Sequence, residues 1–309
     1  MNTKTLKYIL KRIALAVLTV WVVITVTFFV MRAVPGGPFL GEKAISEAAQ
    51  AALEAKYGLD KPLMEQYFTY LKDIITDFDF GPSIKHRGRD VIDIILDGME
   101  TSVKLGVIAA GIALVTGVVL GAVAALRRNK FIDKVIMVIT TACISMPSFI
   151  MGTLLLLVFS LELSLFPANG ETTKGLILPI ITLSLSPMAN ITRLTRSSML
   201  DVLGQDYIRT ARAKGVSSVN IIFGHALKNS LIPVITYCGP MLAYIVTGSL
   251  VVEQIFAVPG IGRYFVNSIT GRDYPLIMGT TIVLASLIVI MNLLSDIMYK
   301  IADPRINLE

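Results

Sequence analysis

The sequence contains few residues of the kinds that perform chemistry. Its 309 residues include two cysteines, two histidines and one tryptophan, and only 16% of them are charged. The dipeptide Gly-Lys is absent, which excludes a Walker A phosphate loop, and so are the HExxH and GxSxG patterns of metalloproteases and serine hydrolases. We therefore expect no catalytic site, no metal and no cofactor in this chain.

The scarce cysteines and histidines form no ligand cluster either. Cys143 and Cys238 fall within apolar stretches, and we expect them to be small packing residues. His86 and His225 belong to segments that the topology below assigns to opposite sides of a membrane, so they cannot share a metal ion.

Apolar residues, in contrast, are abundant. They make up 54% of the chain, and the mean hydropathy of +0.71 excludes an ordinary soluble globular domain. A hydrocarbon core about 30 Å thick needs roughly 20 apolar residues per helix. We therefore expect an all-α, polytopic membrane helical bundle with six spans, at residues 13–31, 101–126, 135–161, 176–191, 231–252 and 276–298.

Two of these spans have unusual features. Basic residues precede 13–31, as in a secretory signal, but no small-residue cleavage site follows it, so we expect an uncleaved helix. The fourth span is the shortest and contains Pro179 and Pro187.

The charges of the connecting segments predict an orientation. Segments 1–12, 127–134, 193–230 and 299–309 hold 16 basic and five acidic residues, whereas those of the other side hold 12 basic and 16 acidic ones. Because basic loops stay in the cytoplasm, both termini and segment 193–230 are predicted to be cytoplasmic. The net charge of +6 is divided among short loops, which argues against a nucleic-acid partner.

Segment 32–100 is then predicted to be a small extracytoplasmic helical cap, inserted into a single transmembrane domain of residues 1–309. Helices are expected at 44–57 and 62–77, with a turn at 78–81 and a further apolar stretch at 91–96. In the second of these helices one face carries Leu63, Tyr67, Tyr70 and Leu71. The cap either contacts a partner protein or is merely solvated surface.

Small residues recur four apart in the second span, at Ala109, Ala113, Gly117, Gly121 and Ala125. Such spacing lines one helical face and lets a neighbouring backbone approach closely. The sequence leaves open whether that neighbour lies in this chain or in a partner.

Three further features lie within or beside the spans. Pro147 predicts a bend in the third span. Asp296 is an acid inside the sixth span, and Lys300 offers it an i,i+4 pairing. An apolar stretch at 251–262 is broken by proline and glycine, and it is a candidate outer gate that comprises Glu253, Phe256, Pro259, Gly260 and Gly262.

The polar segment 193–230, called here the coupling segment, carries two short amphipathic patterns. Leu200, Leu203, Tyr207 and Ala211 are spaced as one helical face, and Arg209, Arg212 and Lys214 mark the polar side. Gly215 ends the first pattern, Ser217 or Ser218 can cap a second helix, and Ile221, Ile222 and Ala226 continue it. A helix-turn-helix of this kind suits contact with a soluble partner better than a plain connector does.

Residues 209–233, RTARAKGVSSVNIIFGHALKNSLIP, resemble the EAA loop of permeases of ABC importers, in the branch that takes up oligopeptides, dipeptides and nickel. Arg209, Thr210 and Ala211 occupy the three lead positions, and Gly215 occupies the glycine position. The leading Glu and the closing Pro of the general pattern are absent, but ARAKG, HALKN with His225, and the later Pro233 match the peptide branch.

The resemblance covers nearly the whole chain. It includes YILKRI before the first span, YGLDKPLMEQY at 57–67, EQIFAVPGIG at 253–262 and the Asp-Pro-Arg near the end, all similar to the first of two peptide permease subunits. It implies a type I ABC-importer permease fold in a bacterial or archaeal cell membrane. In a cell with two membranes, this would be the inner membrane. Its implied partners are a homologous second permease, two cytoplasmic ATPases that bind ATP and Mg²⁺, an extracytoplasmic solute-binding protein and membrane lipids.

The resemblance also implies that the coupling segment docks into a cleft of the ATPase. The apolar side around Tyr207 and Ala211 would enter the cleft, Arg209, Arg212 and Lys214 would meet its rim, and Gly215 would permit the turn. Nickel or glutathione is an alternative substrate within the branch. An intramembrane enzyme or a self-contained channel is an alternative from another class, but the spans show no paired aspartates, Ser–His pair or ligand set.

Overall fold

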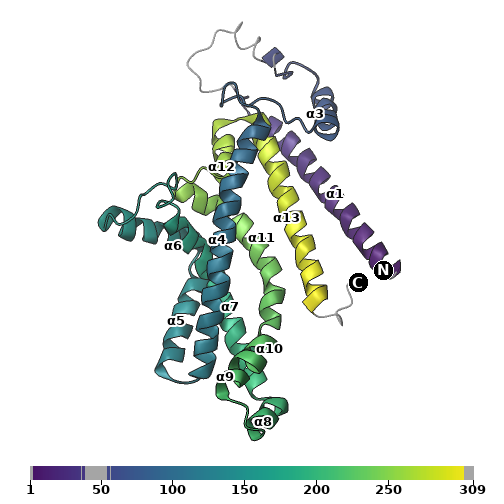
Figure 1. Cartoon of the computed structure of the whole chain (residues 1–309). Coiled ribbons are helices and arrows are strands. Elements are labelled where there is room, and N and C mark those ends of the chain that lie inside the picture. Colours follow the sequence, from purple (N-terminus) through teal and green to yellow (C-terminus); the bar gives the residue numbers. More distant parts are fainter. Residues whose placement is uncertain (1–2, 36, 39–53, 56, 303–309) are drawn as a thin grey trace. The chain divides into compact units, whose positions relative to one another are not determined.

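The computed structural model describes residues 3–35, 37–38, 54–55 and 57–302 (Figure 1). Within them every regular element is a helix, and the one β feature is an isolated bridge between Pro82 and Asp90. The all-α prediction is thus confirmed. The chain divides into two compact units, which are described separately: Met1–Glu100 with Gly260–Leu287, and Thr101–Pro259 with Ile288–Glu309. The single transmembrane domain stays a prediction.

The first unit contains α1 (Thr3–Ala33), α3 (Leu63–Asp77), α12 (Ile261–Gly271) and the beginnings of α4 (Val91–Leu126) and α13 (Tyr274–Ala302). Aromatic residues join α1 to α3. The rings of Phe28 and Tyr67 pack edge to face with centroids 5.2 Å apart, and the Tyr67 hydroxyl lies 2.7 Å from Oγ1 of Thr25. Such a pair contributes about 0.5–1.5 kcal/mol beyond the area that it buries.

The predicted helix 62–77 is confirmed as α3. It starts after Pro62 and ends where Phe78 adopts a left-handed conformation with φ of 54°. Its predicted apolar face is only partly turned inward, because Tyr67 is buried while Leu63 is exposed. The helix expected at 44–57 lies almost entirely outside the described residues. The apolar stretch at 91–96 forms the first turns of α4, so the second span starts ten residues earlier than predicted.

A buried carboxylate holds the loop before α4 against the start of α13. Asp273 is 1% exposed. It accepts hydrogen bonds from the hydroxyl of Ser83 and from the backbone N–H groups of Ile84, Lys85 and Leu276. A carboxylate is favourable at a helix N-terminus, where it satisfies otherwise unpaired N–H groups.

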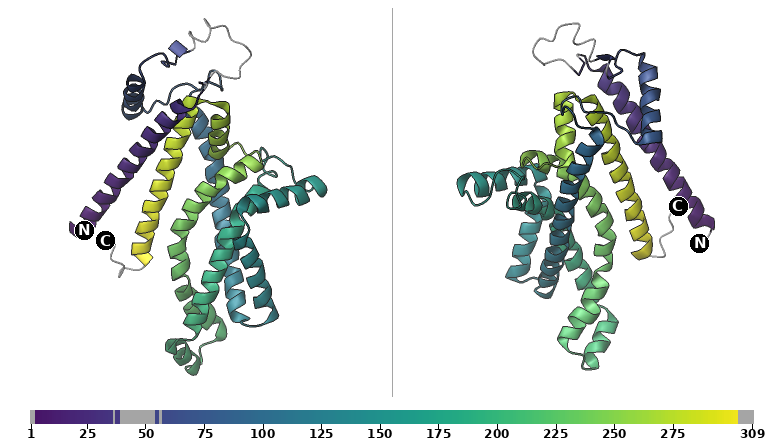
Figure 2. Two further views of the ribbon diagram at one scale, coloured as in Figure 1. Left: turned by 180° about the vertical axis from the view of Figure 1, so that it is seen from behind. Right: turned by 45° about the horizontal axis from the view of Figure 1, so that its top comes forward.

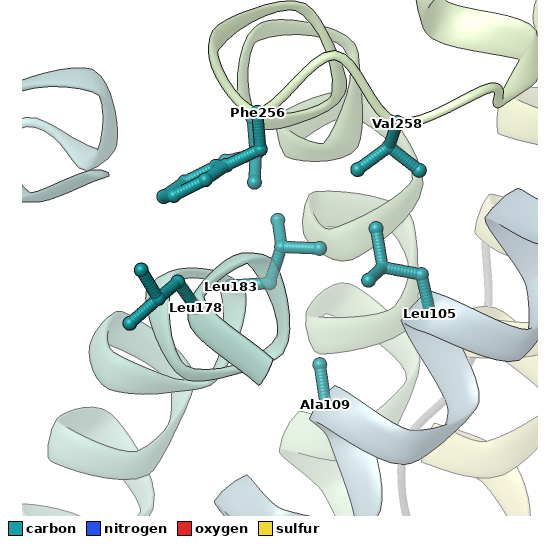
Figure 3. Packing of buried hydrophobic residues seen from close by; sticks show 7 residues of the cluster. Leu105, Ala109, Leu178, Leu183, Phe256 and Val258 are labelled. Atoms are coloured by element: carbon teal, nitrogen blue, oxygen red, sulfur yellow. The ribbon is translucent and has the colours of Figure 1, made fainter. Parts of the chain in front are cut away.

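The second unit is built around α7 (Ile177–Leu203), against which α5 (Phe131–Ser145), α6 (Ser148–Leu155) and α11 (Ile232–Ile255) pack. A π-helix, η1 (Leu156–Glu162), follows α6. One cluster of the core joins α4, α7 and the end of α11 (Figure 3), and its buried members are Leu105, Ala109, Leu178, Leu183, Val252, Phe256 and Val258.

The small-residue face of α4 packs on α7 within this unit. A Cβ added to Gly117 would lie 2.8 Å from the side chain of Ile191, and one added to Gly121 would lie 2.6 Å from the carbonyl oxygen of Thr192. The neighbour that the sequence left undetermined is therefore a helix of the same chain.

The described residues contain four helices long and apolar enough to cross a membrane, or up to six if each of two bent pairs counts as one span. The third predicted span is bent by 107° between α5 and α6. Pro147 disfavours helical backbone at the residue before it, and Met146 is accordingly extended. The bend expected at Pro147 is confirmed. The fifth span is bent by 46°, and the fourth runs on to Leu203 despite Pro187.

Candidate coupling site

The coupling segment folds into several short helices at one end of α7 and α11 (Figures 1 and 2). Its first eleven residues, 193–203, continue α7. After Gly204 come α8 (Asp206–Ala213), α9 (Ser218–Asn220), the π-helix η2 (Ile221–Leu227) and α10 (Lys228–Ser230). The predicted pair of helices is therefore present, as α8 and the continuous helical run 218–230.

The turn between them depends on one glycine. Gly215 has φ of +78°, a left-handed conformation that costs an ordinary L-residue about 1–2 kcal/mol. Its N–H donates to the carbonyl of Arg212, and the N–H of Val216 donates to that of Ala211, which closes the end of α8. Ser217 then caps the next helix by accepting from the N–H of Asn220 at 3.4 Å. Both predicted signals are confirmed.

Apolar side chains fix the segment to the second unit. Ile208 of α8 is fully buried, as is Ala226, and Ile221 is 3% exposed. Ala226 belongs to a cluster with Met199 of α7 and Ala125 of α4. Packed side chains therefore connect η2 to the spanning helices α7 and α4.

The outward side combines positive charge with apolar surface. Tyr207 is 45% exposed, and its hydroxyl accepts a 3.0 Å hydrogen bond from Asn229. Val219 and Phe223 are also exposed, one helical turn apart. Among the remaining predicted residues, Arg209, Thr210, Arg212, Lys214 and His225 are exposed, and Ala211 is half-buried.

One predicted face is wrong. Leu200 and Leu203 were expected to share a helical face with Tyr207 and Ala211, but α7 ends at Leu203 and α8 starts at Asp206. Gln205 between them is extended, with ψ of 151°. The residue that anchors α8 is Ile208, which the predicted face omitted. Gly204, a poor helix former, was the available signal for this break.

A buried ion pair connects the start of α5 to the part of α7 that begins the coupling segment. Asp133, 3% exposed at the start of α5, accepts from Nε and Nη2 of Arg196 in α7 at 2.6 and 2.8 Å. It also accepts from the backbone N–H of Asn129 at 2.9 Å. No sequence pattern joins residues 63 positions apart, and the sequence analysis counted both as loop charges.

The candidate gate residues are distributed between the two units. Glu253 and Phe256 are buried in the second unit, where Glu253 accepts from the hydroxyl of Ser102 at 2.7 Å. Pro259 belongs to the same unit, and Gly260 and Gly262 belong to the first. Residues 251–255 are the end of α11, so the irregular stretch is shorter than predicted. It is shielded by protein, since Gly170 N–H donates to the Phe256 carbonyl. The gating role stays a prediction.

The described residues contain no group of three or more His, Cys, Asp or Glu that could hold a metal ion. Cys143 is buried and Cys238 half-buried, and neither forms a disulfide within the described residues. The side chain of Lys300, the predicted partner of Asp296, is outside the described part of the structure.

Comparison with known proteins agrees with this architecture. Residues 117–308 match the family described as binding-protein-dependent transport system inner membrane component, and residues 5–105 match the N-terminal part of such components. A crystal structure of an amino acid ABC transporter with histidines shares the fold, with a TM-score of 0.54 over 70% of this chain and 95% of that one at 15% identity.

Curated relatives match over nearly the full length. The dipeptide transport system permease protein DppB of Bacillus subtilis is 51% identical over 303 residues, 98% of each chain. The oligopeptide transport system permease protein OppB of Haemophilus influenzae is 43% identical over 304 residues, 97% of this chain and 99% of its own. The chain therefore belongs to the family of inner membrane components of binding-protein-dependent transport systems, and it is a multi-pass membrane permease subunit.

Proposed function

We propose that this chain forms half of a translocation pathway for dipeptides or oligopeptides in the cell membrane of a prokaryote. In a cell with two membranes, the pathway crosses the inner membrane. The other half is a homologous second permease, and an extracytoplasmic binding protein delivers the substrate. The observation that carries the proposal is the identity of 51% and 43%, over nearly the full length, to permeases named for dipeptide and oligopeptide transport.

Two cytoplasmic ATPases, which bind ATP and Mg²⁺, drive this transport through the coupling segment. In support, Tyr207, Val219 and Phe223 expose apolar surface in the same segment as the exposed Arg209 and Lys214, and this composition suits an interface with a soluble protein. The buried side of the same helices packs on α7 and α4. Movement of an ATPase bound to the exposed side of the segment is thus passed to the spanning helices. Alternating access follows as a rigid-body movement of the two halves of the transmembrane region.

The direct test is uptake by intact cells that lack their own peptide importers and express this chain with its partner subunits. We expect ATP-dependent accumulation of a labelled dipeptide and no competition by nickel or glutathione. Accumulation of nickel or glutathione, with peptides inert, would assign the chain to a different substrate within the branch.

Coupling is tested by two substitutions in the same assay. Gly215→Pro cannot adopt the left-handed φ that the turn requires, and Arg209→Glu reverses an exposed charge. We expect each to reduce uptake at least tenfold while the protein reaches the membrane in normal amount. Gly224→Ala is the matched control, because Gly224 lies in η2 of the same segment and an added Cβ there meets nothing within 4 Å. Normal uptake by both test variants would refute the assigned coupling role.

A further inference from the structure

Two adjoining cavities lie in the first unit. One, of about 250 Å³, is lined by both polar and apolar residues and includes Arg32 and Tyr70. The other, of about 460 Å³, is an open groove lined mainly by apolar residues of α1 and α13. Met31 and Tyr274 line both, so the two cavities share a wall.

The guanidinium of Arg32 is held rigidly at the edge of the polar cavity. Its Nε donates to Oε1 of Gln66 at 2.9 Å, and its plane lies 3.6 Å over the ring centroid of Phe28. The Gln66 amide is oriented by its own bonds to the carbonyls of Leu59 and Lys61, at 3.1 and 2.8 Å. Nη1 of Arg32 remains buried and has no hydrogen-bond partner among the described residues.

A second donor in the same cavity is also unsatisfied. The Tyr70 hydroxyl is buried and lacks a partner within the described part of the chain. Burial raises the pKa of Tyr70, so the group stays protonated and can donate. Leaving one buried donor unpaired costs about 1–3 kcal/mol. Two in one cavity therefore indicate an occupant with acceptor oxygens, as a phosphate has.

The other charges around the two cavities have both signs. Asp73 and Asp79 line the polar cavity together with Arg32 and Lys61, of which Lys61 pairs with Glu65 at 3.2 Å, and Arg272 lines the groove. Arg272 is oriented by the carbonyls of Pro35 and Gly37, at 2.9 and 3.3 Å. A purely anionic occupant would face two carboxylates, so a ligand that carries a phosphate and an ammonium group fits better.

The groove continues this site along a membrane span. Val26 and Val30 line it from α1, Val34 lines it just after that helix, and all three are about half exposed, while Ile277 lines it from α13. Val26 and Val30 belong to the candidate span Leu10–Ala33, whose last turn contains Arg32. An arginine at the end of a span lies at the depth of lipid headgroups.

We propose that the two adjoining cavities together bind one phospholipid with an ammonium headgroup. Its phosphate accepts from Nη1 of Arg32 and the hydroxyl of Tyr70, its ammonium lies beside Asp73 and Asp79, and one acyl chain occupies the groove. The site lies outside the coupling segment and does not depend on the proposed function.

The test is native mass spectrometry of the purified, delipidated full-length chain, titrated with dioleoyl phosphatidylethanolamine. We expect one tightly bound lipid, about tenfold weaker binding in Arg32→Gln as the loss of one charged hydrogen bond requires, and a smaller loss in Tyr70→Phe. Arg89→Gln is the matched control, because Arg89 pairs with Asp97 and lines neither cavity. If Arg32→Gln lowers the melting temperature, Tyr70→Phe, which removes a single oxygen atom, decides the test.

Four results would overturn the assignment. Equal or tighter binding of dioleoyl phosphatidylglycerol would refute the ammonium subsite, and displacement of the lipid by inorganic phosphate would indicate a free-anion site. A concentration-dependent dimer in place of the lipid adduct would show that the groove receives a second copy of the chain. Wild-type affinity in both cavity variants would also remove the basis of the proposal.

Discussion

The Asp133 carboxylate and the Arg196 guanidinium form two parallel hydrogen bonds, of 2.6 and 2.8 Å, where α5 starts beside α7. The Asp133 side chain is 4% exposed and that of Arg196 is 24% exposed. The superficially similar pair of Asp206 and Arg209 is 96% and 75% exposed, at 3.4 Å. A bidentate, desolvated pair fixes geometry, whereas an exposed pair contributes little.

The substitution Asp133→Asn should therefore destabilise the protein by about 2 kcal/mol, since it leaves the mostly buried Arg196 without its counter-charge. The measurement is the thermal unfolding midpoint of the purified chain in detergent. Asp206→Asn, the matched control, should leave the midpoint unchanged. An equal effect of the two substitutions would show that the buried pair stabilises the fold no more than the exposed pair does.

Residues that depend on local backbone chemistry were predictable from the sequence, and residues that depend on distant contacts were not. Gly215 and Ser217 act within their own turn, so composition and spacing identified them. Asp133 gains its role only when Arg196, 63 residues later, is folded against it. Ile208 was omitted because the break at Gly204 shifts the register of α8 relative to α7.

The packing of α4 on α7 depends on the absence of side chains along one stripe. A Cβ at Gly121 would meet the Thr192 carbonyl oxygen at 2.6 Å and Cβ of Thr195 at the same distance. Backbone atoms cannot move aside as a flexible side chain can, so the two helices would have to separate. Gly111, on the same helix, is exposed, and an added Cβ there meets nothing within 4 Å.

This contrast gives a matched pair of substitutions. Gly121→Ala should destabilise the chain by about 1–3 kcal/mol through overpacking. Gly111→Ala should be neutral or stabilise it by up to about 1 kcal/mol, because alanine is the better helix former. Thermal unfolding midpoints compared at one detergent concentration provide the measurement. A loss of stability in Gly111→Ala as large as that in Gly121→Ala would contradict close helix approach as the cause.

Helix type was easier to predict than helix boundaries and angles. The four-residue spacing of small residues identified the face of α4, but only the folded chain shows that α7 covers it. Proline chemistry located the bend at Pro147, whereas its angle of 107° is set by packing of α5 and α6 on α7. The start of α4 was misplaced because residues 91–100 mix apolar and acidic residues and were excluded by a purely apolar criterion.

Across the entire chain, the distribution of charge determines how the polypeptide crosses the membrane. The coupling segment and the other predicted cytoplasmic segments hold 16 of the 28 basic residues but five of the 22 acidic ones. Each Lys or Arg in a short loop opposes its transfer across the membrane. The proposed function requires this orientation, since the ATPases that would drive transport are cytoplasmic proteins.

Cysteine labelling in intact cells tests the predicted orientation. In a Cys143→Ser, Cys238→Ser background, Thr76→Cys introduces a thiol on α3 of the cap, and Thr210→Cys introduces one on α8; both positions are exposed. A membrane-impermeant maleimide should label Thr76→Cys in intact cells and Thr210→Cys only after the membrane is permeabilised. Because both positions are exposed and both parent residues are threonine, each variant is the control for the other. Labelling of Thr210→Cys in intact cells would place the coupling segment outside, where no ATP-driven subunit can reach it.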